Sequence, residues 1–233
     1  MLEQAVLVDT DLRGSRFEGA SSRLAVMTGC DLSGVSLVDL DLTMTQLSKA
    51  ILVGCDLSRA TLEQCNFHQA DLCDAKLDDA KAKRAIFNEA KLHRTSFTHA
   101  DLYGALFEKC DMEAADLSDA DMRQCIFHDA RATTSKLTGA DLTYADFSRA
   151  DISRSDFSLA KLFRARFHRT VEVDTIFSSR SAALGFDPTT LIMCMPAHTM
   201  ATTIPLTNGD NAGVSLGVAS GTVMGPARHL TAS

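Results

Sequence analysis

Three histidines stand in the same local setting, each directly after a phenylalanine: His68, His128 and His168. Imidazole nitrogens bind metals such as zinc and exchange protons near neutral pH, so these side chains offer metal or acid–base chemistry. His128 follows His68 by 60 residues, and His168 follows by a further 40. Whether these imidazoles lie close enough together to share a metal ion depends on the structural elements that position them.

Carboxylates are more numerous, and about half of those in residues 1–170 recur at one sequence position. Paired catalytic acids need a cleft and contrasting environments, whereas regular recurrence favours a structural role. A short acceptor at a repeated corner can bind backbone N–H groups as in an Asx-turn. We find no nucleophile motif, phosphate-binding loop or metal-ligand spacing in this region, so we predict no catalytic residue, no cofactor site and no metal site, and therefore no enzyme.

The element behind this regularity is a five-residue repeat. Stepping by five from Leu2 to Phe167 gives Leu, Phe, Met or Ile at every position except Ser22, Ala82 and Ala132. A helix would carry such residues around its surface, and a flat strand would place alternate ones on opposite faces. The backbone must therefore turn within each unit, so that every large side chain points inward. This pattern predicts a solenoid.

The positions beside each large central residue are also constant in type. Two residues earlier the side chain is small, mostly Ala or Cys, and only Val35 and Leu40 are bulky there. The residue just before the centre is most often acidic. Examples of these acidic positions are Asp31, Asp41, Asp56, Asp71, Asp101, Asp111, Asp116, Asp121, Asp141 and Asp151.

This pattern resembles the pentapeptide-repeat family, over about residues 5–170. The segments "ADLSDADM" (115–122) and "ADLTYADFSRADISRSDF" (140–157) match its consensus of Ala, Asp or Asn, Leu or Phe, and two variable residues. The resemblance implies an all-β fold, a right-handed quadrilateral β-helix in which four pentapeptides make one square coil. About eight coils are expected, followed by a short β or loop extension at the C-terminus.

A coil of twenty residues places residues twenty apart in one column. Phe67, Phe87, Phe107, Phe127, Phe147 and Phe167 fall in one column, which Leu47 and Met27 continue toward the N-terminus. Stacked rings at the strand spacing of about 4.8 Å are expected to add ~0.5–1.5 kcal/mol per pair. Ser22 and Ala82 share another column, and we predict loosened packing there.

The same columns separate the candidate ligands. His68, His128 and His168 are expected two or more coils apart on an outward face, too far apart to share a metal ion. Cysteines in one column, such as Cys30 and Cys110, are also several coils apart, whereas a disulfide needs Cβ atoms about 4 Å apart. We therefore predict that the cysteines are small apolar fillers of a reducing compartment.

The chain changes character after Thr170. Residues 171–190 are predicted to be an end cap and linker, because Glu172 and Asp187 occupy central positions and Pro188 follows. Residues 191–233 have few charges, many Gly, Thr and Ser, and a concentrated turn signal, "TNGDNAG". The predicted domains are therefore a β-helix at 1–170, a cap and linker at 171–190 and a separate tail at 191–233.

The tail resembles the PAAR-like toxin-delivery module of bacterial type VI secretion. The segments "MPAHTMATTIPLTNGDNAG" (195–213) and "GVASGTVMGPARH" (217–229) carry the resemblance, which covers part of that module. It implies a position on the secretion spike or a link between the spike and its cargo. PAAR proteins hold zinc with His and Cys at a cone tip, so Cys194, His198 and His229 are either zinc ligands or polar residues with local hydrogen bonds. A fourth ligand is missing from the tail.

Two binding functions compete. The first is a non-enzymatic adaptor of type VI secretion, in which the β-helix is a rigid rod for a protein partner, the spike or a cognate effector. The alternative is an acidic rod that imitates DNA and binds a type II topoisomerase (gyrase), as some pentapeptide-repeat proteins do. The net charge of −7 permits it, but basic residues at 76–94 and in the last coil interrupt the acidic surface.

The composition and the N-terminal segment bear on where the protein is found in the cell. The chain has no apolar run long enough to cross a membrane, and its start, MLEQAVLVDT, lacks the features of a signal peptide. We expect a bacterial cytoplasmic protein, exported with the secretion spike, with no direct binding to nucleic acid and no membrane insertion. The N-terminal coil has no evident cap, so end-to-end self-association is a further prediction.

Overall fold

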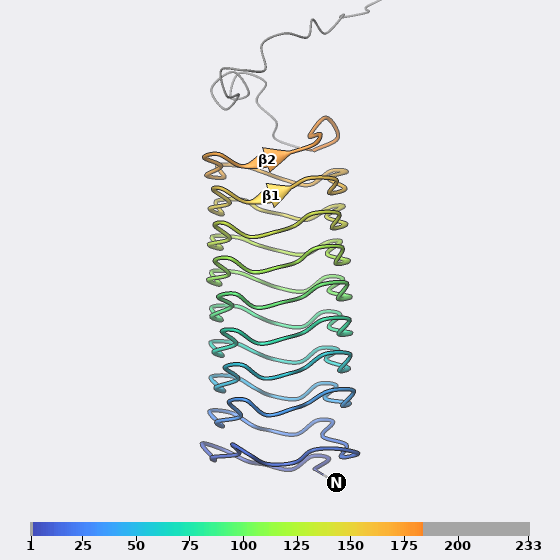
Figure 1. Cartoon of the computed structure of the whole chain (residues 1–233), viewed down its shortest axis with the longest axis vertical. Coiled ribbons are helices and arrows are strands. Elements are labelled where there is room, and N and C mark those ends of the chain that lie inside the picture. The colour runs from blue at the N-terminus through green and yellow to red at the C-terminus, as the bar shows by residue number, and fades with distance from the viewer. Residues whose placement is uncertain (1, 184–233) are drawn as a thin grey trace, which may run out of the picture. The chain divides into compact units, whose positions relative to one another are not determined.

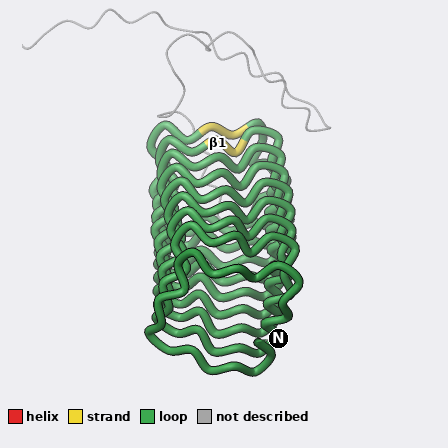
Figure 2. The backbone as a smooth tube through the Cα atoms, turned by 60° about the horizontal axis from the view of Figure 1, so that its bottom comes forward, coloured by secondary structure: helices red, strands yellow, loops and turns green. Residues whose placement is uncertain are grey.

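The computed structural model describes residues 2–183. Residues 2–177 form a square tube of stacked coils, each of twenty residues (Figures 1 and 2). Every backbone bridge in this part of the chain is parallel and joins residues twenty apart, from Val6 with Val26 to Ile176 with Asp156. The predicted quadrilateral β-helix is therefore confirmed, and the described coils contain no insertion that shifts the register.

Regular strands are very short, because each side of the square is only about three residues long. Two pairs of residues qualify as strands, β1 at Asp156–Phe157 and β2 at Ile176–Phe177, and they pair in parallel. Elsewhere one bridge residue per pentapeptide makes the sheet contact. Within the described residues, no helix is long and apolar enough to span a membrane.

Each corner of the square is a tight turn with one residue in the left-handed region. In the unit from Phe87 to Ala90, the Ala90 N–H donates to the Phe87 carbonyl at 3.0 Å, and Glu89 has a φ of 59°. A positive φ at the third residue is the mark of a type II turn. The same position recurs every five residues, which is why the chain direction changes by a quarter circuit in each repeat.

Neighbouring coils are joined by backbone hydrogen bonds in both directions. The Leu52 N–H donates to the Asp71 carbonyl of the next coil at 2.7 Å, and the Asp71 N–H donates back to the Ala50 carbonyl at 2.9 Å. Because this pattern repeats at each side of the square, backbone polar groups of interior coils are satisfied by their neighbours. The result is a stiff stack rather than a set of independent turns.

The large central residues and their small neighbours fill the bore, as predicted. Phe67, Phe87, Phe107 and Phe127 are fully buried, and their ring centroids follow one another at 4.9, 4.9 and 5.0 Å with planes within 7° of parallel. The predicted phenylalanine column is confirmed, and it continues through Phe147 to Phe167. A second column of rings stacks at the other side of the bore, where Phe157 lies 5.0 Å from Phe177.

Polar groups at the small position have a hydrogen-bonding role that the sequence reading missed. The buried hydroxyls of Thr45 and Thr95 each donate, at 2.8 Å, to the carbonyl of the central residue 23 positions earlier. The buried thiols of Cys55 and Cys65 make the same bond at 2.7 Å. These cysteines are therefore donors that link one coil to the preceding one, in addition to being small fillers.

The coil geometry continues past Thr170 to Phe177, although the consensus fades there. Val171 bridges Asp151, Asp174 has the corner value of φ (57°), and β2 completes the side. Residues 178–183 then fold back over the coil below. The Ser178 hydroxyl accepts from the Leu159 N–H at 3.0 Å, and the Ala182 carbonyl accepts from the Arg164 N–H at 2.7 Å. Part of the last exposed backbone edge is thus covered.

Candidate interaction surface

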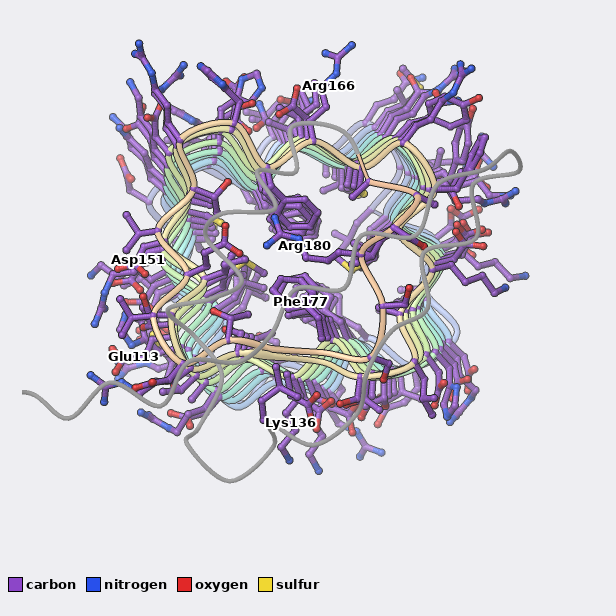
Figure 3. All side chains as sticks on the ribbon, turned by 90° about the horizontal axis from the view of Figure 1, so that it is seen from above. Glu113, Lys136, Asp151, Arg166, Phe177 and Arg180 are labelled. Atoms are coloured by element: carbon purple, nitrogen blue, oxygen red, sulfur yellow. The ribbon has the colours of Figure 1, made fainter. Side chains whose placement is uncertain are left out.

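Functional side chains can only lie on the outside of the rod, because the bore is filled. Each pentapeptide presents one bridge residue in the middle of a side and two turn residues at a corner. Figure 3, which looks down the tube, shows Lys136 and Arg166 pointing outward from opposite sides and Glu113 and Asp151 pointing outward near another. Side chains twenty residues apart lie directly above one another, so the surface is organised in vertical columns.

The acidic bridge residues stabilise the corners, as predicted. The Asp31 carboxylate accepts from the Ser33 N–H at 3.0 Å, and the Asp156 carboxylate accepts from the Ser158 N–H at 2.8 Å. Hydrogen bonds from the Ser33 side chain and backbone lower the pKa of Asp31, and the bond from Ser158 lowers that of Asp156. These carboxylates are thus held as structural acceptors rather than as proton donors.

Many acids are paired with a base one coil away. Asp39, Asp74 and Asp129 each form ion pairs with an arginine twenty residues later, at 2.8, 2.6 and 2.7 Å. The adjacent guanidinium lowers the pKa of each of these three carboxyls. Lysine serves the same purpose for Asp71, Asp116 and Asp141, at 3.3 to 3.4 Å. Negative charge on these columns is therefore locally neutralised.

The three predicted histidines lie in one outward column, in separate coils. Nδ1 of His68 is 3.1 Å from the Asn88 carbonyl, and His128 lies between Asp146 at 3.3 Å and Glu108 at 3.7 Å. These are local contacts with neighbouring coils. That His68, His128 and His168 cannot share a metal ion stays a prediction.

Within residues 2–183, one group has the geometry of a potential metal site, and the sequence reading did not find it. His93 lies 2.9 Å from Asp111 and 3.9 Å from Glu113. Arg131 occupies the same cluster, 3.1 Å from Asp111 and 2.8 Å from Glu113. The Arg131 guanidinium already pairs with both carboxylates, so the arrangement is best described as an ion-pair cluster. The sequence signal for this cluster was the spacing from His93 to Asp111 and Glu113, which is 18 and 20 residues, or about one coil.

The C-terminal end of the bore carries a second feature absent from the sequence prediction. Glu172 occupies a central position, where its side chain would enter the apolar bore, and it forms an ion pair with Arg180. The guanidinium carbon of Arg180 lies 4.5 Å from the ring centroids of both Phe167 and Phe177 (Figure 3). Arg180 therefore covers the last rings of the bore and neutralises Glu172, which explains how an acid is accepted there.

Comparison with protein families identifies the repeat. The family model "Pentapeptide repeats" matches in eight copies, which include residues 5–43, 50–89 and 75–113, and the model "Pentapeptide repeat region" matches residues 100–176. The chain belongs to the pentapeptide-repeat family. The model "Toxin PAAR-like domain" also matches, over residues 175–233. That match begins inside the last coil, immediately before β2. Cys194, His198 and His229 lie outside the described residues, so the possible zinc site stays a prediction.

Solved structures with some likeness to this pentapeptide-repeat protein include HetL, described as involved in heterocyst differentiation regulation in the cyanobacterium Nostoc. It has 25% identity and a TM-score of 0.49, with 75% of this chain and 84% of that chain covered. A trypsin-treated form of QnrB1, described as a plasmid-mediated fluoroquinolone resistance protein, has 17% identity and a TM-score of 0.43, with 81% and 92% covered. No curated protein sequence matches significantly.

Proposed function

We propose that this pentapeptide-repeat protein is a non-catalytic adaptor of a type VI secretion apparatus. The observation that carries the proposal is the Toxin PAAR-like domain match at residues 175–233, which follows the repeat region and begins within its final coil. The PAAR-like region would bind the secretion spike or a cognate effector. The β-helix would act as a rigid spacer and docking surface, in a protein held in the bacterial cytoplasm and exported with the spike.

The physical properties of the rod fit this role. Parallel bridges at every side and continuous ring stacking in the bore make each coil support the next, so a partner on one coil is held at a defined height. The outward columns present side chains at fixed spacing. Rigid positioning of one protein relative to another is what an adaptor on a secretion spike requires.

The alternative, an acidic DNA mimic that binds gyrase, would need long runs of unpaired negative charge. The ion pairs between coils work against it, since Arg59, Arg94 and Arg149 neutralise aspartates on their columns. End-to-end association through the N-terminal coil is a separate proposal. Light scattering at high protein concentration tests it, and a sharply monomeric species would refute it.

The test of the adaptor proposal is co-purification of the full chain with a type VI spike trimer, run beside a gyrase supercoiling assay. We expect spike binding without gyrase inhibition. A variant in the turn-rich tail segment, Gly209→Val, should lose spike binding, whereas the rod variant Ser48→Val, which introduces the same side chain, should keep it. Gyrase inhibition without spike binding would establish the alternative and overturn the adaptor.

A further inference from the structure

One corner of the rod differs in chemistry from the other three. Its turn positions hold Arg84, Tyr103, Arg123, Tyr144, Phe163 and Arg164, which we call the Tyr–Arg corner. Tyr103 and Tyr144 are the only tyrosines of the chain, which has no tryptophan. Because residues twenty apart stack, these side chains form one continuous strip along the coils between residues 84 and 164.

Arginine and aromatic side chains alternate along this corner. The guanidinium carbon of Arg123 lies 5.5 Å from the Tyr103 ring centroid, and that of Arg164 lies 5.8 Å from Tyr144 and 5.5 Å from Phe163. Tyr144 and Phe163 also meet edge to face at 5.8 Å. Tyr144 is 47% exposed and Phe163 is 50% exposed, so the strip keeps much apolar surface in contact with water.

Arg123 pairs with Asp121 at 2.6 Å, but Arg84 and Arg164 differ from the paired arginines of the other corners. Arg59, Arg94 and Arg149 each pair with an aspartate twenty residues earlier. The residues twenty positions before Arg84 and Arg164 are Gln64 and Tyr144, neither of which is an acid. Among the described residues, no carboxylate forms an ion pair with Arg84 or Arg164. A guanidinium stacked on a ring still presents its N–H groups in the plane, where they suit a carboxylate.

Two open hollows lie along the same corner. The first, of about 380 Å³, is lined by Glu63, Gln64, Lys83, Arg84, Tyr103 and Arg123. The second, of about 290 Å³, is lined by Gln124, Ile126, Tyr144, Arg164, Asp146 and Arg166. On the adjoining side, the bridge positions that are acidic elsewhere hold Ile86, Leu106 and Ile126 one above another. Each hollow therefore combines an unneutralised arginine with aromatic surface.

We propose that the Tyr–Arg corner binds an extended protein segment that carries carboxylate and apolar side chains. The carboxylates would pair with Arg84 and Arg164, and the apolar side chains would pack on Tyr103, Tyr144 and Phe163. An extended segment fits because the two hollows lie at different heights along one straight corner. The proposal stands on this surface alone and does not depend on the type VI assignment.

A protein segment fits this surface better than a nucleic acid. The hollows themselves contain the acids Glu63 and Asp146, and the whole chain carries a net charge of −7. A polyphosphate backbone has a charge at every unit and would be repelled by these carboxylates. A peptide can place isolated carboxylates at the two arginines and keep neutral residues between them.

The chain provides its own probe for the test, because both of its tyrosines are on the proposed surface. Tyrosine emission of the full chain is measured during titration with a short peptide in which glutamate and leucine recur between serines. We expect a saturable change with this peptide and none with a twin in which lysine replaces glutamate. Saturable binding of both twins alike, or of neither, would overturn the proposal, as would tighter binding of an oligothymidylate of similar length.

The decisive variant is Arg84→Gln with Arg164→Gln. Gln64 and Gln124 occupy the same turn position in this column with φ values of 56° and 61°, so the backbone accepts glutamine. We expect affinity for the glutamate peptide to fall by about tenfold or more. The matched control, Lys49→Gln with Arg154→Gln, removes two exposed charges at the same turn position on other corners. An equal loss of affinity in both double variants would contradict the assignment to this corner.

Discussion

Arg180 lies with its guanidinium carbon 4.5 Å from the centre of the Phe177 ring, at the C-terminal end of the bore. Its ion-pair partner, Glu172, takes the place of a large apolar side chain. Both side chains are largely buried, with exposures of 14% and 19%. The end of the solenoid is thus closed by a charged pair rather than by another ring.

Removing one member of this pair should be costly. Arg180→Ala leaves the Glu172 carboxylate without its ion-pair partner beside apolar rings, and we expect a loss of about 2–3 kcal/mol in the free energy of unfolding. Chemical denaturation of the full chain measures it. The double variant Glu172→Ala with Arg180→Ala should cost less than the sum of the two single changes. Arg154→Ala, at an exposed corner, is the control and should be close to neutral.

The phenylalanine column should dominate the stability of the middle coils. Phe107→Ala removes a fully buried ring stacked between Phe87 and Phe127, and a loss of about 3–5 kcal/mol is expected. Phe107→Leu should cost less, because Leu47 already occupies this column. Phe163→Ala, which truncates a half-exposed ring, serves as the comparison and should cost below ~1 kcal/mol. Equal effects for Phe107 and Phe163 would contradict the packing described here.

The acidic bridge residues act through hydrogen-bond acceptance, so the amide should substitute for the acid. Asp156→Asn is expected to be nearly neutral, since the Asn66 side chain already accepts from the His68 N–H at 3.0 Å in the same role. Asp156→Ala should lose about 1 kcal/mol. The lowered pKa of Asp156 also predicts that its contribution is present above the unfolded-state pKa and is lost as pH falls through the folded value. Denaturation at pH 7 and pH 3 tests both statements.

The buried thiols predict a dependence on alkaline pH. Burial raises the pKa of Cys55 to about 11 and that of Cys65 to about 12, from 9.0. Above pH 9 the unfolded chain loses these protons first, so stability should be complete below pH 9 and fall as pH rises toward these folded values. Threonine at both positions should flatten this fall, because Thr45 and Thr95 make the same hydrogen bond. An unchanged pH profile in that variant would refute the assignment.

The predicted loosened packing around Ser22 and Ala82 remains to be measured. Both residues are fully buried in a column that otherwise holds Leu or Met, and the Ser22 hydroxyl has no hydrogen-bond partner among the described residues. Ala82→Leu should therefore be neutral or stabilising, and a large loss of stability would disprove spare volume there. Ser22→Ala should raise stability by about 1 kcal/mol, because it removes an unsatisfied hydroxyl.

Much of this fold could be read from the sequence, because one five-residue unit determines the turn, the inward side chain and the bridge. Phe67 and Phe87 could be assigned to one column from their spacing alone. The cluster of His93 with Arg131 and the pairing of Glu172 with Arg180 were harder to predict from the sequence. Outward residues vary freely in the repeat, and Arg180 lies after the last coil, where no periodicity indicates which group it reaches.

The hydrogen bonds of the cysteines were missed for a related reason. Cys55 and Thr45 share a position with alanine, so size explained all three residues. Only the structure shows that the Cys55 thiol and the Thr45 hydroxyl lie beside a carbonyl of the preceding coil. The Tyr–Arg corner is implicit in the twenty-residue columns, which place Tyr103 with Arg123, but spacing alone does not show which outward arginines lack an ion-pair partner.

The coil continues without a break into the first residues of the Toxin PAAR-like match, as far as β2 at Ile176–Phe177. Amide hydrogen exchange of the full chain tests it most directly. The Val171 and Ile176 N–H groups donate to the Ala150 and Ser155 carbonyls, each at 2.9 Å. We predict that these amides are protected like those of interior coils. Exchange of both at the rate of an unstructured peptide would contradict it.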